Sequence, residues 1–145
     1  MSYWIYVTNS NNWGVTQKTN ILGVSARYKN ALSRVKKGDK CLVYVKGEVI
    51  AGDRIEPKLV AQYEIASTVF EDSKKLFNAP PNIADETFNF RIRLKPVEIW
   101  EKPIEFKPLV PKLAFIKNKK NWALHIRGRA IVEIPEDDYH LILRN

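Results

Sequence analysis

The chain has 145 residues, with 24 Lys and Arg against 16 Asp and Glu, one cysteine, two histidines and a formal net charge of +8. This length fits one domain, residues 1–145, which buries roughly 70% of its unfolded surface and needs no disulfide. So few cysteines and histidines exclude a structural zinc site, and the lack of a long apolar run or a signal-peptide pattern predicts a cytoplasmic protein with no membrane partner.

Positive charge is concentrated in two segments of the chain. Residues 18–46 carry eight cationic residues and one acidic residue, and residues 89–129 carry eleven and three, whereas residues 48–88 have a net charge of −4. Basic segments that meet in a fold form a face suited to a polyanion such as nucleic acid. Lysine and arginine also keep surfaces soluble, so charge alone leaves both interpretations open.

The first elements are a strand, a loop and a helix. Residues 3–8 are rich in aromatic and β-branched residues and predict a strand, and the polar cluster at residues 9–12 predicts a loop that leads to Trp13. Ser25 can cap a helix, because apolar residues recur at Tyr28, Ala31, Leu32 and Val35. Residues 36–39 end this helix, and its opposite face carries arginine and lysine.

The middle of the chain predicts two further strands. Residues 40–46 and 59–70 are apolar runs of strand length, with turns marked by glycines between them. Residues 71–76 can form one or two helical turns. The double proline within residues 78–82 predicts a loop, because proline cannot donate a backbone hydrogen bond.

A basic strand follows that loop. Apolar and polar residues alternate strictly from residue 88 to residue 95, which predicts a sheet strand with one buried and one basic face. The apolar members are Phe88, Phe90, Ile92 and Leu94, and the others are Asn89, Arg91, Arg93 and Lys95. We expect the basic face to serve as a binding surface.

The last third alternates short helices with one strand. Three prolines in residues 102–111 allow only short helical turns, and residues 118–123 predict another short helix. Residues 129–134 predict a strand, and Pro135 with three following acidic residues predicts the start of a helix. Five or six strands with inserts too short for regular βαβ crossovers predict an α+β fold: a mixed, mostly antiparallel sheet closed into a small barrel with short flanking helices.

No catalytic constellation is recognisable. A nucleophilic triad needs a base beside the nucleophile, and neither His125 nor His140 lies in a typical setting. The sequence has no glycine-rich phosphate loop, no zinc-protease helix motif and no paired cysteines, and no acid pair is singled out. We therefore expect a binding domain without cofactor or metal rather than an enzyme, and keep an enzyme acting on a flipped base as the less favoured alternative.

Two of the four tryptophans have surroundings that suit base stacking. Trp4 and Trp100 fall in or at the end of strands, as core residues do. Trp13 lies among asparagines and Trp122 follows the basic run of residues 117–121. An indole beside amides and lysines can stack on a base while amides read its edge and cations hold the backbone. The same rings could equally cover the ends of a barrel.

Three segments carry a resemblance to a known family. The segments Tyr3–Asn9, Gly23–Tyr28 and Val35–Lys40 together resemble the EVE-domain family. That family belongs to the PUA-like superfamily and is related to the YTH domains that read methylated adenine in RNA. The likeness extends over essentially the whole chain. It implies a PUA-like pseudo-barrel with a pocket for one modified or flipped base, in DNA for some members and in RNA for others.

The resemblance also implies which residues form the site. In the pocket, Trp13 and Trp122 would supply ring faces, while Asn9 and the backbone around Val24 and Ser25 would hydrogen-bond the base edge. The full pocket set is Asn9, Trp13, Val24, Ser25, Tyr28, Tyr44 and Trp122. The candidate phosphate contacts are Arg27, Lys46, Arg91, Arg93, Lys119, Lys120 and Arg127. Tyr28 also belongs to the apolar stripe of its helix, which favours a core role for it.

The expected partner is nucleic acid, with RNA slightly favoured over DNA because of the wider superfamily. The alternative is a domain that binds a small anion, a metabolite or a protein through the same pocket. The oligomeric state and the particular base stay open at this point.

Overall fold

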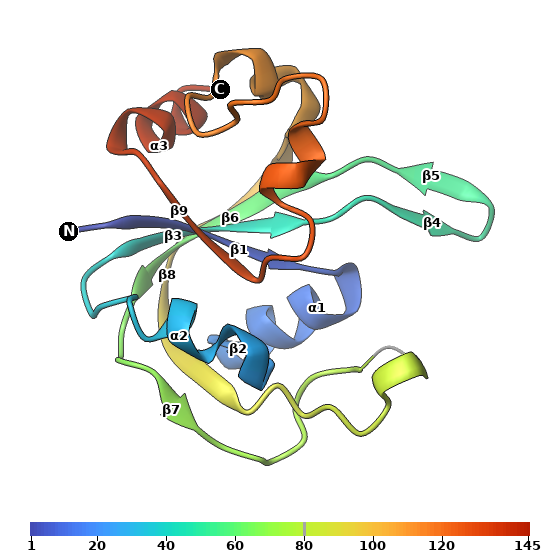
Figure 1. Cartoon of the computed structure of the whole chain (residues 1–145), viewed down its shortest axis with the longest axis vertical. Coiled ribbons are helices and arrows are strands. Elements are labelled where there is room, and N and C mark those ends of the chain that lie inside the picture. The colour runs from blue at the N-terminus through green and yellow to red at the C-terminus, as the bar shows by residue number, and fades with distance from the viewer. Residues whose placement is uncertain (80) are drawn as a thin grey trace.

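The computed structural model describes residues 1–79 and 81–145, and its centre is a curled seven-stranded sheet (Figure 1). The sheet order is β2-β8-β6-β3-β1-β9, and β7 pairs with β8. The strands of the sheet are β1 Tyr3–Thr8, β2 Ile21–Val24, β3 Lys40–Val45, β6 Lys58–Ile65, β7 Phe70–Glu71, β8 Phe90–Glu105 and β9 Ile131–Ile134.

A separate two-stranded hairpin and seven short helical elements complete the fold in the described part of the chain. The hairpin, β4 Glu48–Ile50 and β5 Asp53–Ile55, projects from the body of the molecule (Figure 1). The helical elements are α1 Ser10–Thr19, η1 Ala26–Tyr28, α2 Lys29–Leu32, η2 Pro81–Ile83, η3 Lys107–Lys112, η4 Trp122–His125 and α3 Glu136–Leu143. No helix in the described part of the chain is long and apolar enough to span a bilayer.

The pairing confirms the predicted α+β class with a mixed, mostly antiparallel pseudo-barrel. Strands β1 and β3 run parallel, and every other pair in the sheet is antiparallel. Strand β8 is 16 residues long and pairs with β2 through residues 90–93 and with β6 through residues 94–105. Register shifts between β6 and β8 accompany the bend that curls the sheet.

Strand β1 is buried on both faces because the sheet separates two apolar clusters. Trp4 and Tyr6 lie in one cluster with Leu22 of β2, and Ile5 lies in the other with Phe106. All five of these side chains are at most 2% exposed. The continuous aromatic and β-branched sequence of β1 follows from this double burial.

Two helical regions of the structure differ from prediction. Helix α1 begins at Ser10, inside the loop predicted for residues 9–12, because the side chain of Asn9 caps the helix by accepting a hydrogen bond from the amide of Asn12 at 2.8 Å. The helix expected from Ser25 to Val35 is reduced to η1 and the four-residue α2, and Ser25 makes no side-chain cap.

Two further segments also differ from expectation. Residues 72–76 form no helical turn, and strand β8 continues through Pro103 to Glu105 where only helical turns were expected. Pro103 is tolerated because the outer edge of this half of β8 has no partner strand among the described residues. In the predicted loop of residues 78–82, Pro80 lies outside the described residues and Pro81 begins η2.

Candidate functional site

A cavity of about 630 Å³ opens where the parallel strands β1 and β3 end. Its walls come from the last residues of β1 and β3, from β2 with η1, from residues 83–88 and from residues 122–130. Cavities that hold small molecules usually measure roughly 300–1,000 Å³. The volume therefore suits an organic group of nucleobase size with its substituents, and this cavity is called the base cavity below.

Tyr44, near the end of β3, is a buried polar group in the wall of the base cavity. Its side chain is 3% exposed and packs edge-on against Phe106, with ring centroids 5.0 Å apart. Burial raises the pKa of Tyr44 to about 12, so the hydroxyl stays protonated at neutral pH. Within the described ranges no hydrogen bond joins this hydroxyl to another residue. It is free to donate a hydrogen bond to a ligand.

Trp122, the first residue of η4, forms an aromatic part of the wall. The indole is half-buried, and its ring lies 5.5 Å from that of Phe106, tilted by 47°. Phe106 thus supports both Tyr44 and Trp122 from the second apolar cluster. An indole held from behind in this way can present its remaining surface to a planar ligand.

The wall formed by β2 depends on a glycine. Tyr6 donates a hydrogen bond from its hydroxyl to the carbonyl oxygen of Gly23 at 3.1 Å. A Cβ atom on Gly23 would lie 2.5 Å from Cε2 of Phe77 and 2.9 Å from the carbonyl oxygen of Phe88. Only glycine allows Phe77 and Phe88 to approach β2 this closely.

Ile83, Glu86 and Phe88 form another part of the wall. Glu86 accepts a hydrogen bond from the backbone amide of Phe88 at 2.8 Å, and Phe88 has φ +51, an uncommon value for a residue with a side chain. Asn12 in α1 makes two hydrogen bonds to the backbone of Asn78, at 2.7 and 3.1 Å, and so holds the chain upstream of this wall.

The rim of the base cavity is positively charged. Arg27, Lys46, Arg127 and Arg129 are exposed and line it. The guanidinium of Arg27 lies 4.9 Å from the ring centroid of Tyr28, a cation–π contact. Glu86 is the one acidic lining residue among those described. A negatively charged ligand is therefore favoured at the rim.

The structure brings most of the predicted site residues together. Those that line the base cavity are Asn9, Val24, Ser25, Tyr28, Tyr44 and Trp122 from the predicted pocket, and Arg27, Lys46 and Arg127 from the predicted phosphate contacts. Asn9 uses its carbonyl oxygen to cap α1, and its amide nitrogen makes no hydrogen bond within the described part of the chain.

Trp13 does not line the base cavity. It lies on α1 and packs against the first apolar cluster, with its ring 6.2 Å from that of Tyr63 in an edge-on arrangement. The polar neighbours that predicted a loop are the N-terminal turn of a helix, which turns Trp13 towards the core.

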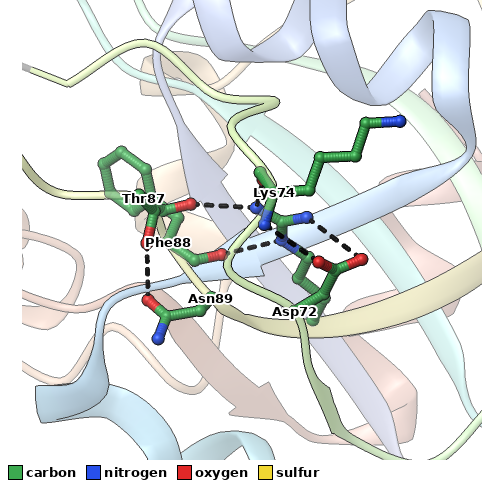
Figure 2. A network of polar contacts seen from close by, with 6 residues as sticks. Asp72, Lys74, Thr87, Phe88 and Asn89 are labelled. Atoms are coloured by element: carbon green, nitrogen blue, oxygen red, sulfur yellow. Dashed lines mark hydrogen bonds and ion pairs between the residues drawn. The ribbon is translucent and has the colours of Figure 1, made fainter.

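Arg91 is a structural residue, contrary to its prediction as a phosphate contact. Its side chain is completely buried. The guanidinium donates to the backbone carbonyl oxygens of Phe88 at 3.1 Å, Thr87 at 3.1 Å and Lys74, and lies 3.8 Å from a carboxylate oxygen of Asp72 (Figure 2). Burial lowers the pKa of Arg91, and Asp72 opposes this effect. The alternation of β8 predicted an exposed face, but Asp72, Lys74, Thr87 and Phe88 cover this face at Arg91.

The remaining predicted phosphate contacts lie outside the base cavity. Arg93 is exposed on β8, with its guanidinium 5.0 Å from the ring centroid of Phe70. Lys119 donates from Nζ to the carbonyl oxygens of Val110 and Leu113. Lys120 lines a second, smaller hollow beyond Trp122.

Sequence reasoning missed several lining residues. Ile83 and Glu86 lie between the loop predicted at residues 78–82 and the strand predicted from residue 88, and Phe88 was predicted to be the first core residue of that strand. No periodicity marks them, because a wall built from irregular backbone leaves no repeat in the sequence.

The chain matches a family model and a curated relative over almost its whole length. The family model described as "EVE domain" matches residues 2–145. A UPF0310 protein of Pyrococcus abyssi is 46% identical over 142 residues, which cover 98% of this chain and 97% of that protein.

Two solved structures share the fold at low sequence identity. Human THYN1, solved in complex with DNA containing 5-methylcytosine, superimposes with a TM-score of 0.63 at 15% identity and covers 99% of this chain and 96% of its own. The YTH domain-containing protein mmi1, solved with RNA, gives a TM-score of 0.60 at 11% identity, with 99% of this chain and 79% of its own covered.

Proposed function

Because this chain belongs to the EVE domain family, we propose that it binds nucleic acid and holds a modified base in the base cavity. The observation that carries the proposal is the cavity itself: a volume of about 630 Å³ with Tyr44 and Trp122 in its wall and four exposed cations lining it. Two structural relatives, one solved with 5-methylcytosine DNA and one with RNA, support nucleic acid as the ligand class.

Each part of the site has a distinct role in this proposal. Trp122 stacks on the base, and the Tyr44 hydroxyl and the Asn9 amide nitrogen hydrogen-bond its edge. Arg27, Lys46 and Arg127 bind phosphate or sugar at the rim and provide affinity that depends on salt. Selectivity for the base therefore comes from the cavity, and general affinity comes from the rim.

The test is a titration of intrinsic tryptophan fluorescence with short RNA and DNA oligonucleotides, single- and double-stranded, with and without base methylation, at two salt concentrations. Quenching that favours one modified base over its plain counterpart at both salt concentrations is expected. Quenching that ignores modification and disappears at high salt would reduce the proposal to non-specific binding by the rim. No binding by any oligonucleotide, together with a higher melting temperature in the presence of a metabolite, would replace it by small-molecule binding.

Two tryptophan variants separate the cavity from the core. Stacking on an aromatic side chain contributes roughly 1–3 kcal/mol per base, so Trp122→Leu should weaken binding of the preferred oligonucleotide roughly 5- to 150-fold. Trp13→Phe is the matched control, because Trp13 packs on Tyr63 outside the cavity and should leave affinity unchanged. Equal losses in both variants would contradict the assignment of Trp122. Melting curves of both variants should be recorded to check that each variant is folded.

A further inference from the structure

A second hollow beside the base cavity gathers positive charge from distant parts of the chain. Its volume is about 220 Å³. Four cations line it: Arg54 from the β4–β5 hairpin, Lys107 from the start of η3, and Lys120 and Arg127 on either side of η4. These residues lie up to 73 positions apart in sequence, so the fold, rather than a local basic run, creates the concentration of charge. It is called the cation hollow below.

One carboxylate positions two of these cations. Oε1 of Glu56 accepts from Nε of Arg54 at 3.0 Å, and its Oε2 lies 2.5 Å from Nζ of Lys107. Glu56 neutralises a single charge among four, so the hollow keeps an excess of positive charge. Side chains held by an ion pair lose less freedom when an anion binds, which favours binding.

The cation hollow and the base cavity share a wall. Trp122, Ala123 and Arg127 line both. A nucleic-acid strand whose base stacks on Trp122 would therefore place its backbone near η4 and the cation hollow. Lysine and arginine together match a phosphate group, which accepts several charge-assisted hydrogen bonds.

We propose that the cation hollow binds a backbone phosphate next to the nucleotide whose base occupies the base cavity, with Arg54, Lys107, Lys120 and Arg127 as its ligands. This inference rests on the proposed function and adds to it a defined position for the strand. Among the described residues of the hairpin, Arg54 is the one that lines the hollow.

The test is the salt dependence of oligonucleotide binding by the double variant Lys107→Gln, Lys120→Gln. The logarithm of the association constant falls as the logarithm of the salt concentration rises. Loss of one phosphate contact should make this slope shallower by about one. Affinity at low salt should fall about tenfold, and the preference for the modified base should not change. Lys112→Gln is the matched control, because Lys112 is exposed at the other end of η3 and does not line the hollow. A slope equal to that of the unchanged protein would overturn the inference.

Two further measurements keep this inference apart from the proposed function. The free modified nucleoside, which has no phosphate, should bind the double variant and the unchanged protein equally well. If oligonucleotides bind with base preference but the double variant has the same salt dependence as the unchanged protein, only the phosphate assignment fails. If no oligonucleotide and no nucleoside binds, the proposed function fails. A third outcome combines two results: inorganic phosphate shifts the amide resonances of residues 107 and 120, and the double variant binds oligonucleotide as the unchanged protein does. This outcome would assign the hollow to free phosphate and overturn its assignment to a nucleic-acid backbone phosphate.

Discussion

The hydroxyl of Tyr28 donates a hydrogen bond to the carbonyl oxygen of Gly128 at 2.9 Å and joins two segments that lie 100 residues apart in sequence. Both residues line the base cavity. Gly128 has φ +73, which glycine adopts without strain, and this conformation accompanies the turn that follows η4. The bond connects η1 with the loop after η4 and so ties two walls of the cavity at the rim.

Removal of this tie should loosen the rim. Tyr28→Phe keeps the ring and deletes the donor, so the free energy of unfolding should fall by only about 0.5–1.5 kcal/mol. Amide hydrogen exchange of residues 127–130 should become faster, because one wall loses its connection to the other. Tyr3→Phe is the control, since that hydroxyl donates to Glu136 at 3.1 Å, outside the lining residues. Unchanged exchange at residues 127–130 would show that the loop is held by other contacts.

Arg91 should matter for stability and Arg93 should not. Arg91→Lys removes several hydrogen bonds that a lysine cannot replace, so the free energy of unfolding should fall by about 2–3 kcal/mol. Arg93→Lys, two residues along the same strand, keeps an exposed cation and should change it by less than about 0.5 kcal/mol. Urea unfolding of both variants measures the difference. Equal stability of the two would contradict the structural role of Arg91.

Replacement of Gly23 and of Gly14 by alanine should change the stability of the protein in opposite directions. Gly23→Ala places a methyl group 2.5 Å from the Phe77 ring and 2.9 Å from a backbone oxygen, so it should destabilise the protein by about 1–3 kcal/mol. Gly14→Ala meets no atom within 4 Å and lies inside α1, so it should stabilise by up to about 1 kcal/mol. Thermal unfolding should show melting temperatures that move apart. A Gly23→Ala variant with unchanged stability would mean that Phe77 and Phe88 can withdraw from β2 at no cost.

Asp39 should stabilise the protein at neutral pH and not in acid. Its carboxylate is 5% exposed and accepts hydrogen bonds from the indole of Trp4 at 2.9 Å and from the backbone amides of Ser2 and Lys36, both at 3.0 Å. Burial alone would raise the pKa of Asp39, but these hydrogen bonds outweigh it and lower the pKa below its ordinary value. A carboxyl whose pKa is lower in the folded state contributes stability above the unfolded pKa and loses it as pH falls through the folded pKa.

The corresponding measurement compares Asp39→Asn with the unchanged protein at pH 7 and pH 3. At pH 7 the variant should be less stable by about 1–3 kcal/mol, and the difference should narrow at pH 3, below the unfolded pKa of roughly 3.9. Asp53→Asn, on the exposed hairpin, should change stability at neither pH. A difference of the same size at both pH values would assign the effect to packing rather than to charge.

Strand patterns were predictable from the sequence because the sheet imposes them directly. The apolar runs of β3 and β6 and the acidic start of α3 after Pro135 follow from burial and from the charge preference of a helix N-terminus. The loop prediction for residues 9–12 was wrong because asparagine favours both loops and helix caps. A short helix with a weak apolar stripe gives little other signal in the sequence.

The site was predictable only in part, for a physical reason that Arg91 illustrates. Alternation along β8 reports which side chains share a face, but not whether a second layer covers that face. Asp72, Lys74, Thr87 and Phe88 form such a layer over Arg91, while Arg93 stays exposed. The convergence of Arg54 and Lys107 likewise depends on long-range packing that no local pattern encodes.

The neighbours of β1 constrain the order in which this sheet can be completed. Residues 3–6 pair with β9 at residues 131–134, and residues 3–8 pair with β3. During synthesis β1 leaves the ribosome long before β9 has been made. The edge of β1 that pairs with β9 therefore keeps free backbone amides and carbonyls until most of the chain has been synthesised. Nascent chains that stop before β9 should therefore depend on chaperones to avoid association through that edge.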